Sequence, residues 1–338
     1  MFTSETLREE LSKPKQIVIT THHKPDGDAL GSSLAVYHWL KAKGHAAHVV
    51  VPSDFPAFLD WMPGREDVII YTANKTDSDV LIAEADIIFC LDFNGLSRIH
   101  AMADSVKNAG GVKIMIDHHL DPQGFDDYRH WDSNAAATAQ LVYDFMVHVM
   151  GDHESITPDI ATCLYTGIMT DTGSFRFQTT TPSVHLIVAD LITSGAKNWE
   201  IHEKVYNSYT ENRLKFLGFC LVNRLEVLHE YRTALFSVSR QDLQRFNITT
   251  GDTEGLVNYA LAISGMRLAA LIVDRTDQVK LSLRSVGDFP CNELCRDHFN
   301  GGGHRNAAGG NANEPLPVVV EKFKALLPEY KTRLIPNN

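Results

Sequence analysis

The first half of the chain alternates short apolar segments with longer segments of helical periodicity. Residues 16–20, 48–51, 86–92 and 112–117 are apolar, rich in β-branched side chains and short enough to be strands. Between them, apolar residues recur every three or four positions, as on one face of a helix. This alternation is typical of βαβ units, which build a mostly parallel sheet with helices on both faces.

After the fourth strand-like segment, the sequence predicts helices at 137–150 and 157–170. Residues 196–222 are polar and then helical, and we interpret them as a helical linker. The residues that follow mix strands and helices without the regular alternation of the first half. We therefore predict an α/β protein with a parallel-sheet domain at 1–195 and a smaller mixed α/β domain at 223–338.

Composition limits the partners of the chain. With 338 residues it can bury two separate cores. No apolar run approaches the roughly 20 residues that span a bilayer, and the first residues are polar, so we expect a cytoplasmic protein without a membrane partner. The five cysteines are scattered, which indicates free thiols in a reducing compartment.

Charge is distributed unevenly along the chain. Residues 1–226 hold 18 Lys and Arg against 30 Asp and Glu, a net charge of −12, whereas residues 227–338 hold 13 against 12, a net of +1. Long nucleic acids bind to clustered cations, so we expect none to bind the acidic part. Such a surface suits multivalent cations, which themselves attract phosphate.

Acidic and histidine side chains follow the predicted strands. The residues at or just after the ends of these strands are His22, Asp26, Asp28, Asp92, Asp117, His118 and His119, and Asp171 lies just past the second predicted helix. Because the carboxyl ends of parallel strands meet at one edge of a sheet, we expect these side chains in a single crevice. A simpler interpretation also exists for single members, since Asp28 precedes a helix and can be its N-cap.

The ligand types narrow the choice of metal. Imidazoles and carboxylates without a thiolate exclude a Cys-rich zinc site and suit Mn²⁺ or Mg²⁺, with Co²⁺ or Fe²⁺ as alternatives. There are more candidate ligands than one ion binds, and their number suits two ions that share a carboxylate. This arrangement hydrolyses phosphate esters by in-line attack of water, whose pKa the cations lower.

Six segments form a characteristic series, in chain order HHKPDGDALGSS, CLDF, IDHHLD, GIMTDTGSF, VKLSLRS and GGGHRNAAGG. These segments resemble the DHH phosphoesterase family and its DHHA1 domain. The resemblance covers essentially the whole chain. In length and layout the sequence is similar to the nanoRNase A branch, small two-domain enzymes that degrade very short RNAs and remove the 3′-phosphate of 3′-phosphoadenosine 5′-phosphate (pAp).

The resemblance implies a role for each motif residue. His22 and Asp26 would hold one Mn²⁺ ion. Asp28, His118 and Asp171 would hold a second. Asp92 would bridge both ions, and His119 would act on the phosphate. Asp117 would support these residues without binding an ion itself. The residues implied in substrate binding are Arg284, Gly301, Gly302, Gly303 and His304, with Arg267 and Arg305 as further candidates.

Other interpretations remain open from the sequence. GGGH can be a plain glycine turn, Arg284 a solvated strand residue and His23 a solvent-facing residue without a role. The same motifs would serve a phosphodiesterase for cyclic-di-AMP or pApA. A non-catalytic nucleotide-binding regulator is a further alternative, whereas the GGGH segment argues against an inorganic pyrophosphatase. A homodimer is compatible with all of these.

Overall fold

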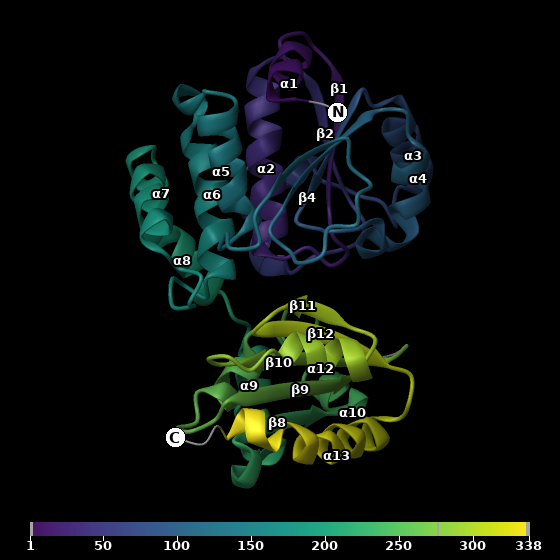
Figure 1. The fold of residues 1–338 in the computed structure, drawn as a ribbon, viewed down its shortest axis with the longest axis vertical. Coiled ribbons are helices and arrows are strands. Elements are labelled where there is room, and N and C mark those ends of the chain that lie inside the picture. Colours follow the sequence, from purple (N-terminus) through teal and green to yellow (C-terminus); the bar gives the residue numbers. More distant parts are fainter. Residues whose placement is uncertain (1–2, 276, 336–338) are drawn as a thin grey trace. The chain divides into compact units, whose positions relative to one another are not determined.

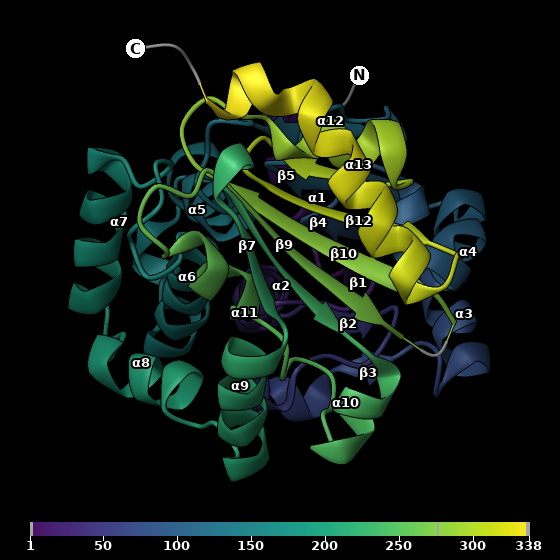
Figure 2. The ribbon, with the colours of Figure 1, turned by 90° about the horizontal axis from the view of Figure 1, so that it is seen from below.

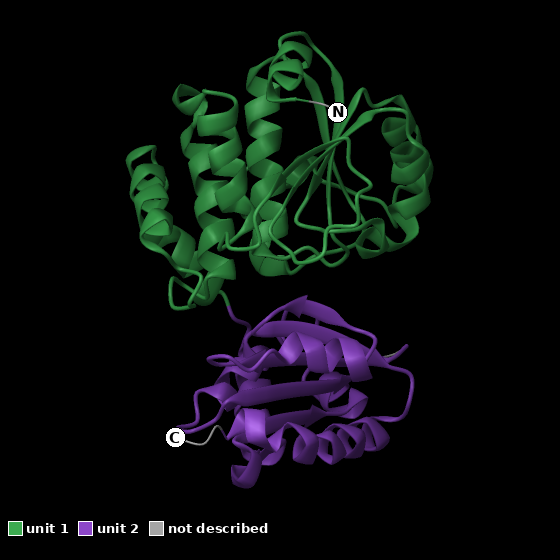
Figure 3. Cartoon of the chain, viewed as in Figure 1, with its two compact units in different colours: residues 1–208 green, residues 209–338 purple. Residues whose placement is uncertain are grey.

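The computed structural model describes residues 3–275 and 277–335, and it divides into two compact units, Met1–Ser208 and Tyr209–Asn338 (Figure 3). The division falls between α8 (Asn198–Tyr206), which lies within the segment predicted as a linker, and α9 (Glu211–Asn223), which ends one residue beyond that segment. The domain limits at residues 195 and 223 stay a prediction.

The first unit contains a six-stranded sheet that is parallel throughout, in the order β3-β2-β1-β4-β5-β6. Its strands are β1 (Gln16–Thr21), β2 (Ala46–Val51), β3 (Ile69–Ile70), β4 (Ile87–Leu91), β5 (Val112–Asp117) and β6 (Tyr128–Trp131). The predicted parallel sheet is therefore confirmed. The sequence did not single out the edge strands, because β3 is only two residues long and β6 is polar.

Alternating side chains of the sheet enter two different cores. Ile17 and Ile19 of β1 face one core, and Val18 faces the other, as the two-residue period of a strand requires. The first core lies under α2 (Gly27–Ala42), α5 (Thr138–Asp144) and α6 (Pro158–Asp171), and the second under α3 (Lys75–Glu84) and α4 (Ala103–Asn108) (Figure 1). Both faces of the sheet are covered, as predicted.

The remaining helices of this unit differ slightly from expectation. The predicted helix 137–150 is α5 followed by a π-helical turn at Phe145–Val149. The N-terminal α1 (Ser4–Glu10) and the helix α7 (Pro182–Thr193) were not predicted from the sequence. Within the described ranges, no helix is both long and apolar enough to cross a bilayer.

Two glycines let α2 and α6 pack unusually closely. A Cβ atom on Gly31 would lie 2.5 Å from the carbonyl oxygen of Cys163, and one on Gly27 would lie 2.4 Å from Oγ1 of Thr170. The first turn of α2 therefore lies beside the last turn of α6. This close approach brings the end of α6, at Asp171, to the same edge of the unit as the loop after β1.

The second unit is a mixed sheet in the order β11-β12-β10-β9-β8-β7, antiparallel except for the β8–β9 pair (Figure 2). Its strands are β7 (Leu225–Leu228), β8 (Thr233–Val238), β9 (Leu268–Asp274), β10 (Val279–Ser285), β11 (Gly302–His304) and β12 (Ala307–Ala312). One core lies under α12 (Cys291–His298) and α13 (Leu316–Leu334), and the other under α9, α10 (Arg240–Arg245) and α11 (Leu256–Leu261).

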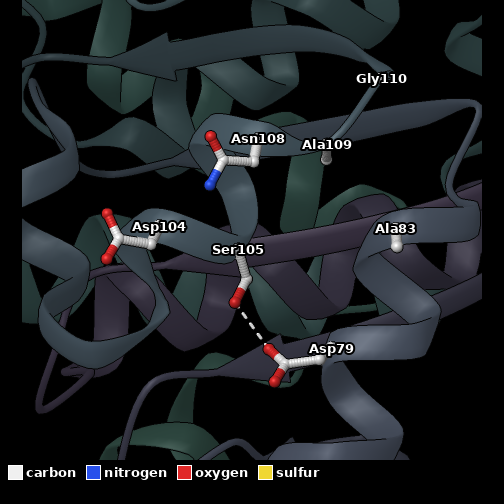
Figure 4. A pocket seen from close by; sticks show the side chains of 7 residues that line it. All are labelled: Asp79, Ala83, Asp104, Ser105, Asn108, Ala109 and Gly110. Atoms are coloured by element: carbon white, nitrogen blue, oxygen red, sulfur yellow. Dashed lines mark hydrogen bonds between the residues drawn. The ribbon is translucent and has the colours of Figure 1, made fainter.

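A surface cavity of about 320 Å³ lies between α3 and α4 of the first unit (Figure 4). Its lining consists of Asp79, Ala83, Asp104, Ser105, Asn108, Ala109 and Gly110. The Asp79 carboxylate accepts hydrogen bonds from the hydroxyls of Ser105 (2.6 Å) and Tyr71 (2.8 Å). The cavity contains none of the residues predicted to bind metal or substrate.

Candidate metal centre

The predicted metal ligands of the first unit meet at one edge of its sheet. β1 ends immediately before His22, β4 ends immediately before Asp92, and β5 ends at Asp117. Because β1, β4 and β5 are neighbours and parallel, their carboxyl ends share that edge. Among the described residues of this unit, groups with ligand atoms within 4.8 Å of one another are His22, Asp26 and Asp92; Asp28, Asp92 and His118; and Asp92, Asp117 and His119.

The first group surrounds the His22 ring. Nε2 of His22 lies 3.4 Å from Oδ2 of Asp92 and 3.9 Å from Oδ2 of Asp26. Nδ1 of the same ring lies 3.0 Å from the carbonyl oxygen of His23, to which it donates in the tautomer that leaves Nε2 as an acceptor. The ring therefore turns Nε2 towards two carboxylates, as a metal-binding histidine does.

The second group surrounds the His118 ring in the same way. Nδ1 of His118 lies 3.1 Å from the carbonyl oxygen of Ala135. Nε2 lies 3.5 Å from Oδ2 of Asp171, 3.6 Å from Oδ1 of Asp92 and 3.8 Å from Oδ2 of Asp28. These separations are longer than a good hydrogen bond, and they are short enough for two such atoms to bind one cation at about 2.1 Å each.

Asp26 and Asp28 have different structural roles, although one residue separates them. The N-cap of α2 is Asp26, whose side chain accepts from the backbone N–H groups of Asp28 (3.0 Å) and Ala29 (3.1 Å). The alternative that Asp28 caps this helix is therefore wrong. Asp28 instead accepts from the N–H groups of Thr138 (2.6 Å) and Ala139 (2.8 Å), in the first turn of α5.

Asp92 is the carboxylate that the groups share. Its backbone has φ = 64°, a left-handed conformation that is uncommon outside glycine, and its side chain is almost fully buried. Oδ1 accepts a 2.8 Å hydrogen bond from the hydroxyl of Thr138. Burial alone would raise the pKa of Asp92, but the hydrogen bond with His22 and the charge of His119 lower it below its usual range. Asp92 is thus held as a carboxylate.

His119 is held from both of its ring nitrogens. Nδ1 donates to Oδ1 of Asp117 at 2.8 Å, and Nε2 lies 3.4 Å from Nη2 of Arg98. The other oxygen of the fully buried Asp117, Oδ2, has no hydrogen-bond partner among the described residues. Such an orphaned carboxylate oxygen is unusual in a folded protein and fits a place beside a cation.

The crowding of buried carboxylates at this edge also indicates a site for cations. Asp28 is only 1% exposed; burial raises its pKa well above the usual value, and the carboxylates of Asp92 and Asp171 raise it further. Burial also raises the pKa of Asp171 to about 6, although the neighbouring His118 opposes that rise. Several carboxylates that share a buried site repel one another unless cations lie between them. The donor set, its geometry and its charge therefore fit divalent cations.

Sequence reasoning missed two residues at this site, Thr138 and Arg98. Thr138 lies at the start of α5, and its bonds to Asp28 and Asp92 cross more than forty residues of sequence, so no local pattern marks it. Arg98 lies in the 3-10 helix η3 (Leu96–Met102), which follows β4. His23, expected to face solvent, is half-buried and stacks on the ring of His100 with centroids 4.2 Å apart.

In the second unit, the fold itself explains two of the three adjacent glycines. A Cβ atom on Gly301 would lie 2.0 Å from the carbonyl oxygen of Gly309, and Gly303 combines φ = 137° with a Cβ position 2.6 Å from the carbonyl oxygen of Ala307. Gly302 has an ordinary φ and open space: no described atom lies within 4 Å of its Cβ position. Packing therefore does not explain why residue 302 is a glycine.

Arg284 and His304 lie in one row across this sheet. Ala307 of β12 pairs with Arg284 of β10 on one side and with His304 of β11 on the other. Residues in register on neighbouring strands share a face, so the two long side chains flank a small alanine on the same face. The further candidates Arg267 and Arg305 both contact Asp288, through an ion pair and through its carbonyl oxygen respectively.

Comparison with known families agrees with this architecture. The model of the DHH family, N-terminal domain, matches residues 16–168, and that of the DHHA1 domain matches residues 233–334. The chain belongs to the DHH phosphoesterase family. DHH phosphoesterases are metal-dependent enzymes, in accord with the Asp and His groups at the edge of the first sheet.

Relatives of this DHH chain span nearly its whole length. The bifunctional oligoribonuclease and PAP phosphatase NrnA of Thermus thermophilus is 32% identical over 318 residues, 94% of this chain and 90% of that protein. The protein of the same name from Bacillus subtilis is 26% identical over 87% of this chain and 88% of its own length. The crystal structure of an exopolyphosphatase-related protein from Bacteroides fragilis has 40% identity and a TM-score of 0.93, covering 98% of this chain and 97% of that one.

Proposed function

We propose that this chain hydrolyses short RNA oligonucleotides to mononucleotides and pAp to AMP, with Mn²⁺ as the metal, two ions per chain. The observation that carries the proposal is the position of Asp92, whose carboxylate lies in reach of both the His22 and the His118 group. The family membership gives the reaction class, and the names of the relatives indicate the substrates.

The residues divide between the two ions as the motifs imply. His22 and Asp26 would hold one ion. Asp28, His118 and Asp171 would hold the other, with Asp92 between them. When bound, two divalent cations lower the pKa of a water molecule and offset the negative charge that develops on the phosphoryl oxygens. Mg²⁺ or Co²⁺ has the same ligand preferences and is the alternative.

The protein side chains would position the reacting groups. Thr138 orients Asp92, and the start of α5 orients Asp28, so hydrogen bonds from the protein fix the positions of both carboxylates. Asp117 accepts from Nδ1 of His119 and so fixes the orientation of this ring, which would act on the phosphate. No step requires a covalent enzyme intermediate.

The second unit would hold the substrate. Arg284 can grip a phosphate in a two-pronged fashion, and His304 lies in the same row of the sheet. Between Gly301 and Gly303, the open Cβ position of Gly302 would allow a phosphate to approach the backbone N–H. The first 226 residues are acidic, which favours short substrates over long nucleic acids. A cytoplasmic location and a homodimer belong to the same proposal.

A substrate series assayed with manganese tests the proposal. We expect turnover of pAp and of two- to five-residue RNAs to exceed that of pApA and cyclic-di-AMP. A preference for the cyclic dinucleotide would instead support the alternative phosphodiesterase, and absence of turnover with every substrate would support a non-catalytic binding protein.

Two variants assign the units to their roles. Asp171→Ala should remove most turnover, and activity near that of the wild type in manganese would refute its assignment as a ligand. Arg284→Ala should raise KM for dinucleotides more than it affects hydrolysis of a generic phosphodiester. An equal loss on both substrates would indicate a folding defect rather than lost substrate binding.

A further inference from the structure

Arg98 lies at the edge of the first sheet, beside the metal ligands. It belongs to η3, directly after the β4 end that supplies Asp92. Its guanidinium Nη2 lies 3.4 Å from Nε2 of His119. Arg98 therefore lies beside His119.

The surroundings of Arg98 differ from those of Arg65 and Arg129, which pair with carboxylates, and from those of Arg8 and Arg176, which donate to backbone carbonyl oxygens. Arg65 pairs with Asp60 at 2.9 Å, and Arg129 pairs with Asp126 at 2.8 Å. In the part of the chain that the structure describes, Arg98 has no carboxylate within 4.0 Å and one side-chain hydrogen bond, to an imidazole. A guanidinium has five N–H donors, so most of those on Arg98 remain for a ligand.

The backbone holds Arg98 in place before any ligand arrives. Its N–H donates to the carbonyl oxygen of Gly95 at 3.0 Å, and its own carbonyl oxygen accepts from the N–H of His23 at 2.8 Å. The stacked pair of His23 and His100 flanks this connection between the loops after β1 and β4. Because the backbone at Arg98 is fixed in this way, only its side chain loses conformational freedom on binding, which favours affinity.

We propose that Arg98 binds the phosphoryl group that is hydrolysed, donating two N–H groups to its non-bridging oxygens. A half-buried arginine without a carboxylate partner, next to groups that fit cations, suits an anion that carries two oxygens in one plane. Negative charge grows on these oxygens in the transition state, so a fixed guanidinium lowers the barrier. The ligand class is a phosphate mono- or diester, and the inference rests on the proposed phosphoesterase reaction.

The test compares Arg98→Gln and Arg98→Lys with Arg65→Gln, which removes the same charge away from the cluster. Turnover of bis(4-nitrophenyl) phosphate and binding of inorganic phosphate to the manganese-loaded protein are measured, together with manganese content and the urea midpoint. We expect Arg98→Gln to lower kcat/KM by about 100- to 1000-fold and to weaken phosphate binding at least about tenfold. Manganese content should be unchanged, Arg98→Lys should recover part of the loss, and Arg65→Gln should match the wild type.

A double variant separates phosphate binding from a purely positioning role. If Arg98 acted only by holding His119, Arg98→Gln would add nothing to the loss caused by His119→Ala. An absent further loss, or phosphate binding as tight as in the wild type, would overturn the proposal. The generic ester and inorganic phosphate contain no nucleotide, so a failure on RNA and pAp refutes the proposed substrates and leaves this test intact.

Discussion

Replacing Gly302 by alanine separates substrate binding from folding in the GGGH segment. Because no described atom lies within 4 Å of the new Cβ and the φ angle is ordinary, the fold accepts the methyl group. Alanine also restricts the unfolded chain, so the free energy of unfolding should stay the same or rise by about 0.4–1 kcal/mol. Stability alone would therefore classify this substitution as harmless.

The matched substitution Gly301→Ala has the opposite effect on folding. Its Cβ would lie 2.0 Å from the carbonyl oxygen of Gly309, well inside the 3.4 Å at which ordinary contact begins. The partner is backbone in β12, so a side-chain rotation cannot relieve the clash. We expect Gly301→Ala to lower the free energy of unfolding by about 1–3 kcal/mol or more.

The functional effect of Gly302→Ala follows from the phosphate that its N–H would bind. A methyl group at this position keeps a phosphate oxygen away from the N–H, and a charge-assisted hydrogen bond contributes about 1.5–3 kcal/mol. We therefore expect KM for pAp to rise about 10- to 150-fold, since 1.4 kcal/mol corresponds to a factor of ten.

Urea unfolding followed by circular dichroism gives the stability of both variants, and steady-state assays with pAp give KM. The reasoning on substrate binding would be refuted by a KM for pAp in Gly302→Ala within twofold of the wild type. The steric reasoning would be refuted if Gly302→Ala lost more stability than Gly301→Ala.

Three further outcomes are expected. Gly167→Ala would place a Cβ 2.9 Å from Oδ1 of Asp28 and 2.6 Å from Cβ of Ala139. This variant should lower the free energy of unfolding in urea by about 1–3 kcal/mol and weaken manganese binding in a titration. An unchanged affinity for manganese would contradict the dependence of the metal site on the position of Asp28. Manganese at 100 times its dissociation constant should raise the free energy of unfolding of the wild type by about 2.7 kcal/mol for each ion bound, and EDTA should reverse the rise. Asp92→Asn should show a much smaller rise, and an equal rise would exclude Asp92 as a ligand. Hydrogen bonds from Lys75 and Ser105 lower the pKa of Asp79 to about 2. The contribution of Asp79 to stability is therefore complete above the ordinary pKa of 3.8 and is lost as the pH falls towards 2. The difference in urea midpoint between the wild type and Asp79→Asn should shrink over that range, and a constant difference would contradict this expectation.

The sequence was sufficient to place most of the candidate site. His22, Asp92 and Asp117 are adjacent to strands that the apolar pattern marks, and parallel strands bring such residues to one edge. The cap of α2 was harder, because Asp26 and Asp28 are both suitable residue types at nearly the same position. Only the path of the backbone decides which of them accepts from its own helix and which from α5.

Residues whose partners are far away in the chain could not be predicted from the sequence. Thr138 and Arg98 have no local pattern that points to Asp92 or His119, because their contacts depend on how α5 and η3 pack. The glycines of GGGH are alike as sequence letters. In the structure Gly301 and Gly303 are required by the backbone of β12, and only Gly302 is free for another purpose.

The amino-acid sequence by itself determined the parallel sheet, the residues at its edge and the chemical class of their ligands, since periodicity and residue type are local properties. The tertiary structure decided how those residues are used. Close packing of α2 on α6 through Gly31 and the first turn of α5 fix which carboxylates face each histidine. Distances of a few ångströms between segments far apart in sequence arise only from packing, so no single segment could specify them.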